Sequence, residues 1–451
     1  MINLVDKLTE KIYPTLVEWR RDFHKHAESG WVEFRTASIV AAKLVSWGYK
    51  VQVGREVIHE EDRMGVPDEH ILKQQEKRAL SQGADSEWLK HFSGGFTGVV
   101  GILDTGIPGP TVAYRVDMDA LDIQESPSKN HRPVKEGFSS INANMMHACG
   151  HDSHTAIGLG TAYVLSQIKD QLKGRIKLIF QPSEEGVRGA KSMVTAGVVD
   201  DVDIFIAIHV GFGAELGELI CGDLGFMATT KFDVTYTGEA SHAGARPEQG
   251  NNALLAAATA SLNLHAISRH SEGYSRINVG YLQAGSGRNI IPNKAHFKVE
   301  VRGETTLIND YMYQKALQIV QSAADMYEVE SNIKIVGAAE SAESSEELVS
   351  YLSQQAKKFD EIHTIKNSYT LGGSEDATYM MSRVQEKGGH AAYLVFGTKI
   401  SAGHHNEQFD IDEKVMPIAV KILALSAHHA GDFLKDDQSI NNLFKYGGEN
   451  D

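Results

Sequence analysis

The stretch Lys231–His265 has the sequence KFDVTYTGEASHAGARPEQGNNALLAAATASLNLH, and it begins the pattern that decides the fold. An alternating strand at Phe232–Tyr236 is followed by a helix rich in Ala and Leu at Asn252–Ser268. Further along, the same periodicities predict a strand, a strand, a helix and a strand at Ile277–Leu282, Ala295–Val301, Asp310–Tyr327 and Asn332–Val336. The order βαββαβ is typical of a ferredoxin-like domain. We therefore predict a second domain over residues 226–338, inserted within a larger one.

Residues 1–225 and 339–451 carry the pattern of an α/β domain with a sheet between two helical layers. The predicted strands are 51–53, 97–103, 111–116, 175–180, 204–209 and 394–397, and the predicted helices lie within 4–49 and at 154–168, 346–359 and 415–434. Strands that alternate with helices favour a sheet covered on both faces. The charged segment at about 59–92 has few apolar anchors, and we predict a helical insertion there.

Composition limits the classes of protein to which this chain can belong. The 451 residues suffice for two hydrophobic cores, and 44 Lys+Arg against 59 Asp+Glu give a net charge of −15. That balance disfavours nucleic acid as a partner, because phosphate binding needs clustered basic side chains. Two cysteines cannot form a disulfide framework, and no stretch approaches the roughly 18 apolar residues of a membrane span. The N-terminus also lacks a secretory signal pattern, so we expect a cytoplasmic protein without a membrane partner.

Possible metal ligands fall at predicted strand ends and loops. They are Asp117, Asp119, His147, Cys149, His151, Glu184, Glu185, His209, His404 and His405. Singly, each is more often a buried thiol, a hydrogen-bonded imidazole or a solvated carboxylate. Glu184 and Glu185, however, follow a buried strand and precede a glycine, so they lie at the edge of a sheet where ligands bind. Thiolate, imidazole and carboxylate together suit Zn²⁺, Mn²⁺, Co²⁺ or Fe²⁺ better than Mg²⁺ or Ca²⁺.

Two other catalytic patterns are weaker. The run GSGRN at 285–289 lacks the lysine and the following helix of a phosphate-binding loop. Cys149 with His151 suggests a cysteine nucleophile, but neighbours at a strand end seldom meet as nucleophile and base, and no separate His–Asn pair is evident.

Several longer runs resemble one clan of hydrolases. They are RRDFHKHAESGWVEFRTA (20–37), RVDMDAL (115–121), MHACGHDSHTA (146–156), QPSEEGVRGAKSMV (181–194), AIHV (207–210), GEASHAGARPEQGNNAL (238–254) and HHNEQFDIDE (404–413). These runs look like the amidohydrolase branch of the two-metal aminoacylase and carboxypeptidase clan, alongside hippurate and auxin-conjugate hydrolases. The insertion, GGSEDATYM (372–380) and GTKISAGHHNEQF (397–409) most resemble the A subunits of aminobenzoyl-glutamate hydrolases. The resemblance implies a metallopeptidase-like catalytic domain with an inserted lid or dimerisation domain.

The resemblance also implies a ligand set for two divalent cations: Cys149, His151, Glu185, His209 and His405. His405 is preferred to His404 because relatives place the ligand just before an Asn-Pro-x-aromatic run, which residues 405–409 match except for the proline. Glu184 would be the general base that takes a proton from water and returns it to the leaving amine. Mn²⁺ is favoured by the resemblance, and Zn²⁺ is possible on ligand softness.

Further residues match supporting positions. Asp119 and His154 would orient a ligand or the reacting water, and Asp117 is a weaker ligand candidate. In the lid, His242 resembles a histidine that steadies the oxyanion in the site of a neighbouring subunit. Matches to substrate-binding positions are Asn289, Arg302, Gly373 and Ser374, with the guanidinium suited to a carboxylate. This arrangement implies a homodimer, or a heteromer with a related B subunit, that pairs through the lid.

The predicted reaction is hydrolysis of p-aminobenzoyl-glutamate to p-aminobenzoate and glutamate. A broader N-acyl-amino-acid amidohydrolase or dipeptidase would use the same chemistry on another substrate. The chain could instead be a weakly active partner subunit of a heteromeric hydrolase, although all five predicted ligands and the base are present.

Overall fold

The larger domain is built on a mixed sheet of eight strands in the order β1-β2-β4-β3-β5-β12-β6-β11. The computed structural model describes residues 1–370 and 372–446, apart from the side chains of Asp223 and 436–446. The strands are β1 (Lys50–Val53), β2 (Val99–Asp104), β3 (Thr111–Asp117), β4 (Arg175–Gln181), β5 (Ile204–Val210), β6 (Glu218–Asp223), β11 (Thr364–Ser368) and β12 (His390–Phe396). Strands β4, β3, β5 and β12 are parallel, whereas β2 and β6 pair antiparallel with β4 and β12.

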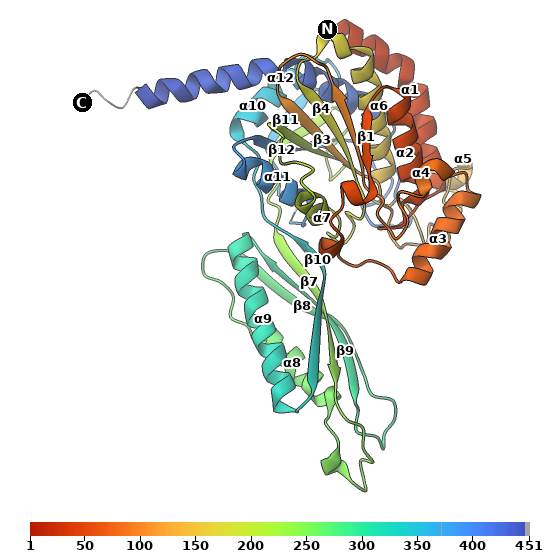
Figure 1. Cartoon of the computed structure of the whole chain (residues 1–451), viewed down its shortest axis with the longest axis vertical. Coiled ribbons are helices and arrows are strands. Elements are labelled where there is room, and N and C mark those ends of the chain that lie inside the picture. The colour runs from red at the N-terminus through yellow and green to blue at the C-terminus, as the bar shows by residue number, and fades with distance from the viewer. Residues whose placement is uncertain (371, 447–451) are drawn as a thin grey trace.

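Helices cover both faces of this sheet (Figure 1). One layer contains α1 (Ile2–Lys25), α2 (Phe34–Ser46), α6 (His151–Gln167), α10 (Glu346–Ala356) and α12 (Val415–Tyr446), and the other contains α7 (Ala190–Thr195) and α11 (Ala377–Glu386). Along β3, Tyr114 and Val116 pack into the first layer and Ala113 into the second, because successive side chains of a strand point to opposite faces. The predicted α/β/α arrangement is confirmed.

The second sheet has four antiparallel strands in the order β10-β7-β9-β8. Its elements are β7 (Ala228–Thr237), α8 (Ala253–His265), β8 (Ser275–Ala284), β9 (Lys294–Gly303), α9 (Thr306–Met326) and β10 (Glu330–Ala339). Phe232, Val234 and Tyr236 pack under the two helices, so the alternate residues of β7 occupy the opposite, uncovered face. The predicted ferredoxin-like βαββαβ order is confirmed, and we call this unit the lid. In Figure 1 the β7–α8 loop lies at the end of the lid farthest from the larger sheet.

The remaining elements are short. They are η1 (Gly54–Glu56), η2 (Glu60–Asp62), α3 (Glu69–Ser81), α4 (Ser86–Leu89), α5 (Arg132–Glu136), η3 (Lys169–Gln171) and η4 (Pro247–Gln249). The charged segment 59–92 thus contains helical turns, which pack against α2. Strands β6 and β11 were not predicted, because their sequences ELICGD and TIKNS are short and carry polar residues or glycine. Helix α11 was not predicted either. Strand β12 begins four residues earlier than predicted, at His390 instead of Leu394.

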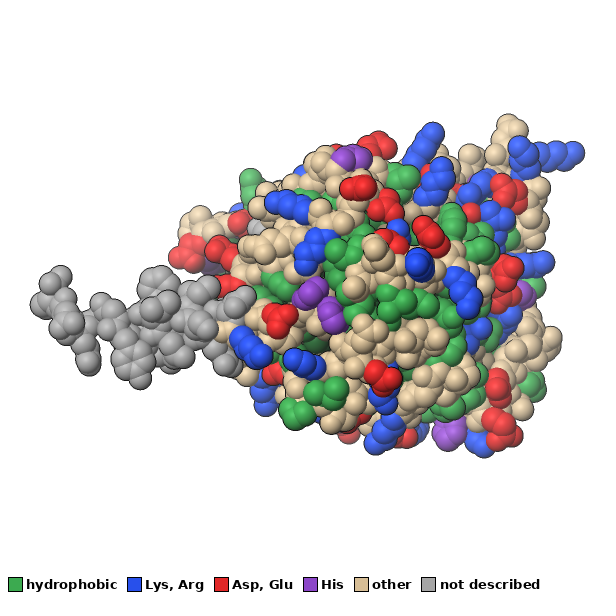
Figure 2. Space-filling view, turned by 90° about the horizontal axis from the view of Figure 1, so that it is seen from above, with side chains coloured by type: hydrophobic (Ala, Val, Ile, Leu, Met, Phe, Trp, Pro, Cys, Tyr) green, Lys and Arg blue, Asp and Glu red, His purple; other side chains and the backbone are tan. Residues whose placement is uncertain are grey.

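No helix within the described residues is long and apolar enough to cross a membrane. The face shown in Figure 2 carries acidic and basic side chains in alternation, without a continuous basic stripe over its described part.

A buried guanidinium joins three segments that lead to the loops at the sheet edge. Arg20 of α1 lies with Nε 2.8 Å from Asp152 Oδ2, Nη2 2.7 Å from Asp410 Oδ1 and Nη1 3.4 Å from Glu413 Oε1. Burial alone would lower the pKa of Arg20, but the three carboxylates raise it. Because Asp152 lies in the first turn of α6 and Asp410 and Glu413 precede α12, these contacts fix both of those segments against α1.

Replacing Arg20 by methionine (R20M) should therefore destabilise the protein by about 3–5 kcal/mol, since the buried carboxylates lose their common counter-ion. Urea unfolding followed by circular dichroism measures the change. The matched control is Lys73→Met, which removes an exposed lysine paired with Glu69 and should leave the unfolding midpoint nearly unchanged. Equal effects of the two substitutions would contradict this view of Arg20.

Candidate metal centre

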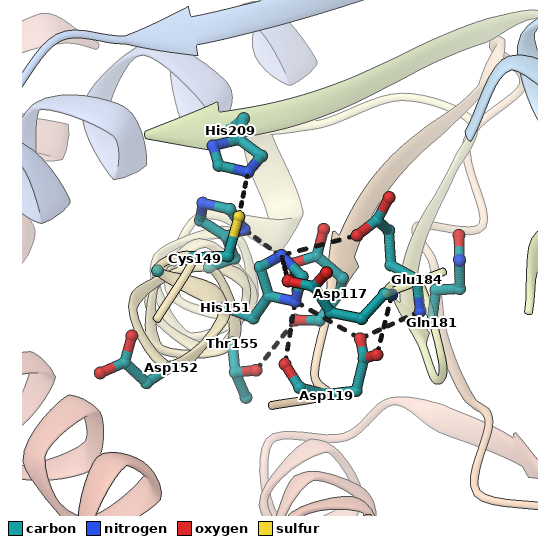
Figure 3. Close-up of polar contacts among 12 residues, drawn as sticks. Asp117, Asp119, Cys149, His151, Asp152, Thr155, Gln181, Glu184 and His209 are labelled. Atoms are coloured by element: carbon teal, nitrogen blue, oxygen red, sulfur yellow. Dashed lines mark hydrogen bonds and ion pairs between the residues drawn. The ribbon is translucent and has the colours of Figure 1, made fainter. Parts of the chain in front are cut away.

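The candidate site lies at one edge of the larger sheet, where parallel strands end together. Asp117 is the last residue of β3, Glu184 and Glu185 follow the end of β4, and His209 is the penultimate residue of β5. The helix α6 begins at His151, directly after Cys149 and Gly150. Figure 3 shows the side chains of Cys149, His151, Glu184 and His209 pointing toward one another. This is the position where open α/β sheets bind ligands.

The five predicted ligands come together in overlapping groups. Cys149 Sγ lies 3.5 Å from His209 Nε2, and His405 Nε2 lies 3.6 Å from Glu185 Oε2. His151 Nε2 lies 3.9 Å from Glu185 Oε1. Potential ligand atoms of Cys149, His151 and His209 lie within 4.8 Å of one another, as do those of Cys149, Glu185 and His405. The two groups share the thiol, so the geometry is suited to two adjacent cations.

The tautomers of two histidines leave bare nitrogen atoms facing this centre. His209 Nδ1 donates to the Val210 carbonyl at 2.8 Å, and His151 Nδ1 donates to the Asp119 carbonyl at 2.9 Å. In the neutral form of each ring, which is the form that binds a cation, Nε2 therefore carries a lone pair. Within the described residues, His151 Nε2 and Glu185 Oε1 are buried and have no hydrogen-bond partner. Buried polar atoms rarely stay unpaired, and these two fit the coordination of a cation.

His404 and His405 differ in what they present to the centre. His404 Nε2 accepts from the Phe212 backbone N–H at 3.1 Å, so its Nδ1 carries the proton and donates toward Cys149 Sγ at 3.6 Å. Its ring stacks on Phe212 with centroids 4.5 Å apart. His405 has a positive φ of 64° and directs Nε2 at Glu185. The geometry favours His405 as the ligand and His404 as a donor to the thiolate.

The loop that carries Glu184 and Glu185 is held by two buried carboxylates. Asp119 accepts the backbone N–H groups of Glu184 at 3.0 Å and Glu185 at 2.9 Å. Glu33 accepts the Ser183 N–H at 2.8 Å, and burial followed by the charge of Asp119 raises the pKa of Glu33 to about 8. Ser183 and Val187 have positive φ values of 55° and 60°, a region that non-glycine residues rarely adopt. The carboxylates thus fix a strained turn.

Asp117 is already engaged by other side chains. Its Oδ1 accepts from His154 Nδ1 at 2.6 Å, and its Oδ2 accepts from Arg115 Nη1 at 2.9 Å. Burial alone would raise the pKa of Asp117, but His151, His154 and Arg115 hold it well below its usual range. His154 Nε2 accepts from the Val210 N–H at 3.0 Å, so His154 also has both nitrogens occupied. These two residues orient the site instead of facing its centre.

Glu184 lies beside two acidic residues that sequence patterns did not single out. Carboxylate oxygens of Glu184, Glu375 and Asp376 lie within 4.8 Å of one another. Burial, then the charges of Glu375 and Glu185, raises the pKa of Glu184 well above its usual range. Glu375 accepts from Arg115 at 3.0 Å and from the Tyr393 hydroxyl at 2.6 Å. The sequence signal for these two residues is the run Gly-Gly-Ser-Glu-Asp at 372–376. An acidic pair at the start of a helix is common, so this run alone does not indicate a site.

The predicted substrate-binding residues are spread over three places. Gly373 and Ser374 lie where the chain enters the lid, since Met227 N–H donates to the Gly373 carbonyl at 2.9 Å and Ser374 donates to the Met227 carbonyl at 2.6 Å. Arg302 lies on β9 and donates to Glu300 at 3.0 Å. Asn289 belongs to the far end of the lid, where its carbonyl accepts from Ala243 N–H at 3.0 Å.

His242 lies beside Asn289 at that far end, paired with Ile290 as an isolated bridge. Its Nδ1 accepts the N–H groups of Gly244 and Ala245, which leaves Nε2–H exposed to solvent. The β7–α8 loop that carries it is remote from the larger sheet in Figure 1. One chain alone therefore does not bring His242 or Asn289 to the candidate centre.

Sequence comparison identifies a family and relatives of nearly full length. The model of "Peptidase family M20/M25/M40" matches residues 113–429. The A subunit of the p-aminobenzoyl-glutamate hydrolase of Escherichia coli (strain K12) is 55% identical over 94% of this chain and 97% of its own. The indole-3-acetyl-aspartic acid hydrolase of Enterobacter agglomerans is 56% identical over 94% of this chain and 98% of its own.

A solved structure gives the same result in three dimensions. The crystal structure of an aminobenzoyl-glutamate utilization protein from Klebsiella pneumoniae matches with a TM-score of 0.83 and 49% identity. The match covers 94% of this chain and 98% of the other. Both domains of this chain are therefore shared with that protein.

The two neighbouring histidines allow a sharp test of the centre. H405A should retain about one Mn²⁺ per chain, because it loses a bare ligand nitrogen, whereas H404Q should retain about two and bind them roughly 10-fold more weakly. Elemental analysis after desalting and calorimetric titration with Mn²⁺ measure both quantities. The reverse order, with H404Q losing a cation and H405A keeping both, would assign the ligand to His404.

Proposed function

The chain belongs to peptidase family M20/M25/M40, and on that premise we propose that it hydrolyses the amide bond of p-aminobenzoyl-glutamate, releasing p-aminobenzoate and glutamate. It is a metallo-amidohydrolase of this family. The observation that carries the proposal is the meeting of potential ligand atoms from Cys149, His151, Glu185, His209 and His405 beside Glu184, with His151 Nε2 and Glu185 Oε1 buried and unpaired. The identity of the substrate is supported by the 55% identity to one subunit of a p-aminobenzoyl-glutamate hydrolase.

Two divalent cations are part of the proposal. The bare Nε2 atoms of His151 and His209, the carboxylate of Glu185 and the shared thiol of Cys149 suit Mn²⁺ or Zn²⁺, and we favour Mn²⁺. When bound, such cations lower the pKa of a water molecule and polarise the scissile carbonyl. Asp119 keeps Glu185 in place through its backbone N–H, and His404 donates a hydrogen bond to the thiolate.

Glu184 is proposed as the general base. Its Oε2 lies 3.8 Å from His151 Nε2, and this distance supports a role beside the reacting water and not as a necessary ligand. It would accept a proton from that water and then donate the proton to the nitrogen of the leaving glutamate. Glu185 is directed at His405, so the two adjacent glutamates have separate roles.

A second chain is proposed to complete the site. His242 has an exposed Nε2–H at the end of the lid, remote from the centre of its own chain, and we propose that it reaches the centre of a partner molecule. There it would donate to the oxygen that becomes negatively charged when water attacks the amide. The partner is a second copy of this chain or a related B subunit, since the Escherichia coli relative is named as one subunit of a hydrolase.

A second candidate substrate is N-(indole-3-acetyl)-aspartate. The supporting observation is the 56% identity to an indole-3-acetyl-aspartic acid hydrolase over 94% of this chain. Both candidates join an aromatic acyl group to an acidic amino acid, and they differ in the acyl group and in one methylene of the leaving side chain.

The purified Mn²⁺-loaded protein should cleave p-aminobenzoyl-glutamate with a kcat/KM at least about 10-fold above that for indole-3-acetyl-aspartate and for hippurate. E184Q should lower kcat by about 10²–10⁴-fold with unchanged Mn²⁺ content, because it removes the proton acceptor alone. The matched control is Glu61→Gln, an exposed glutamate of η2. Chromatographic assay of released amine measures the rates. A preference for indole-3-acetyl-aspartate would select the second candidate.

Mixing variants tests whether His242 acts across the boundary between two chains. E184Q and H242A should each be nearly inactive alone, but co-expression should restore about a quarter of the wild-type activity, since half of the dimers then contain one intact site. Activity per mole and light scattering of the purified mixture measure the result. Dimers without any recovered activity would show that His242 serves its own chain or no site. A monomeric protein would identify the missing partner as a related B subunit.

A further inference from the structure

A cleft of about 590 Å³ runs from the candidate metal centre along the uncovered face of the lid. One wall is the turn after β4, with Glu185, Gly186 and Arg188, and the other is formed by strands of the lid. Lys231 of β7 contributes to the second wall. Glu185 belongs both to the candidate ligand set and to this wall, so a molecule in the cleft would contact the centre directly.

Arg188 is a cation without a carboxylate partner in the cleft wall. Its Nε donates to the Glu185 carbonyl at 2.7 Å and its Nη1 to the Gly65 carbonyl at 3.4 Å. Among the residues that the structure describes, none forms an ion pair with it. A Cβ on Gly30 would lie 2.4 Å from Arg188 Nη2, and one on Gly65 would lie 2.7 Å from its Cδ. The absence of side chains at the two glycines leaves room for Arg188, and the two carbonyl groups restrain the orientation of its guanidinium.

Lys231 is the second poorly paired cation. Its side chain is 31% exposed, and Nζ lies 4.0 Å from Glu300, at the limit of an ion pair. Arg302 already donates to the same Glu300 oxygen at 3.0 Å. The stem of Lys231 extends toward the turn after Glu185, since a Cβ on Gly337 would lie 3.4 Å from Lys231 Cδ and 2.2 Å from the Gly186 carbonyl oxygen.

Three other acidic residues of the cleft are hydrogen-bonded or paired with groups other than Arg188. Asp122 accepts from the Ser29 hydroxyl at 2.5 Å. Asp233 lies 3.7 Å from His296 Nε2 and opposite Lys298 in the strand register, and Glu300 is held by Arg302. Apart from the 4.0 Å contact between Lys231 and Glu300, neither Arg188 nor Lys231 forms an ion pair with a described residue, and both line the cleft beside Glu185. An anionic group of a bound molecule would supply the missing partner.

We propose that Arg188 and Lys231 form the subsite for the side-chain carboxylate of an acidic leaving amino acid. The inference rests on the proposed function and adds the residues that select the amino acid. A guanidinium with a fixed orientation binds a carboxylate bidentately, and an ammonium adds a point charge from the opposite wall. The carbon of the α-carboxylate is two bonds from the scissile nitrogen, so this group stays beside the metal ligands. The cleft extends away from those ligands, in the direction that a longer side chain would take.

This assignment differs from the one that sequence resemblance implied for Arg302. Arg302 lines a neighbouring cavity of about 780 Å³, which shares Asn278 and Glu300 with the cleft but is lined by none of the candidate ligands, and its guanidinium donates to Glu300. Arg302 therefore affects Lys231 indirectly, because it pairs with the Glu300 carboxylate that would otherwise pair with Lys231.

The experiment compares p-aminobenzoyl-glutamate with p-aminobenzoyl-glutamine, which has nearly the same shape without the side-chain charge. Wild-type protein should prefer the glutamate substrate in kcat/KM. R188Q and K231M should each lower that preference by about 10- to 100-fold, because a charge-assisted hydrogen bond is lost for one substrate only. The matched control is Lys298→Met, a lysine of the same cleft that faces Asp233, which should change the preference by less than about threefold.

Direct binding supplies a second readout that does not depend on turnover. In the E184Q background, K231M should weaken binding of p-aminobenzoyl-glutamate in calorimetry by about 10-fold or more and leave the glutamine analogue unchanged. Melting temperature and Mn²⁺ content confirm that each variant is folded and loaded. Equal losses for both substrates would overturn the subsite while leaving the proposed hydrolase intact. A wild-type protein that cleaves neither substrate would overturn the proposed function and the subsite together.

Discussion

The candidate site depends on one interaction, the acceptance of two successive backbone N–H groups by the Asp119 carboxylate. Those groups belong to Glu184 and Glu185, so a single side chain from the end of β3 sets the position of both the proposed base and a proposed ligand. The turn includes non-glycine residues at positive φ and would relax without that restraint. Asp119 also offers its carbonyl to His151 Nδ1, which directs the opposite nitrogen inward. One residue thus orients three others.

The same turn connects the centre to the lid. Ala338 N–H of β10 donates to the Val187 carbonyl at 2.8 Å, and Gly337 packs on Gly186, where any larger residue would collide. A movement of the lid relative to the larger sheet therefore pulls on the segment that carries Glu185. Lys231 lies on the strand paired with β10, so the proposed carboxylate subsite would move with the lid as well. With the proposed subsite, binding of the acidic side chain would therefore affect the geometry of the centre through these contacts.

The layers and the lid could be predicted because buried faces require apolar residues at regular intervals in the sequence. In β7, Phe232, Val234 and Tyr236 all face one core, and no other arrangement explains that alternation together with the helix after it. The family assignment from ordered motifs is confirmed, since those motifs carry unusual residue types in a fixed order. No comparable sequence pattern identifies Arg188 or Lys231. The role of a cation depends on whether a carboxylate lies opposite, and that is decided by packing between segments far apart in sequence.

The electrostatics of the site argue for cations independently of any resemblance. Burial, then the charges of Glu375 and Glu185, raises the pKa of Glu184 well above its usual range, and burial followed by Asp119 and Asp117 raises the pKa of Glu185 to about 7 despite the opposing charge of His151. Carboxylates placed this close favour protonation unless positive charge lies among them. A proposed base and ligand must be ionised to work. Divalent cations reverse the local balance and restore the charged forms, so the acidic cluster and the bare imidazole nitrogens point to the same requirement.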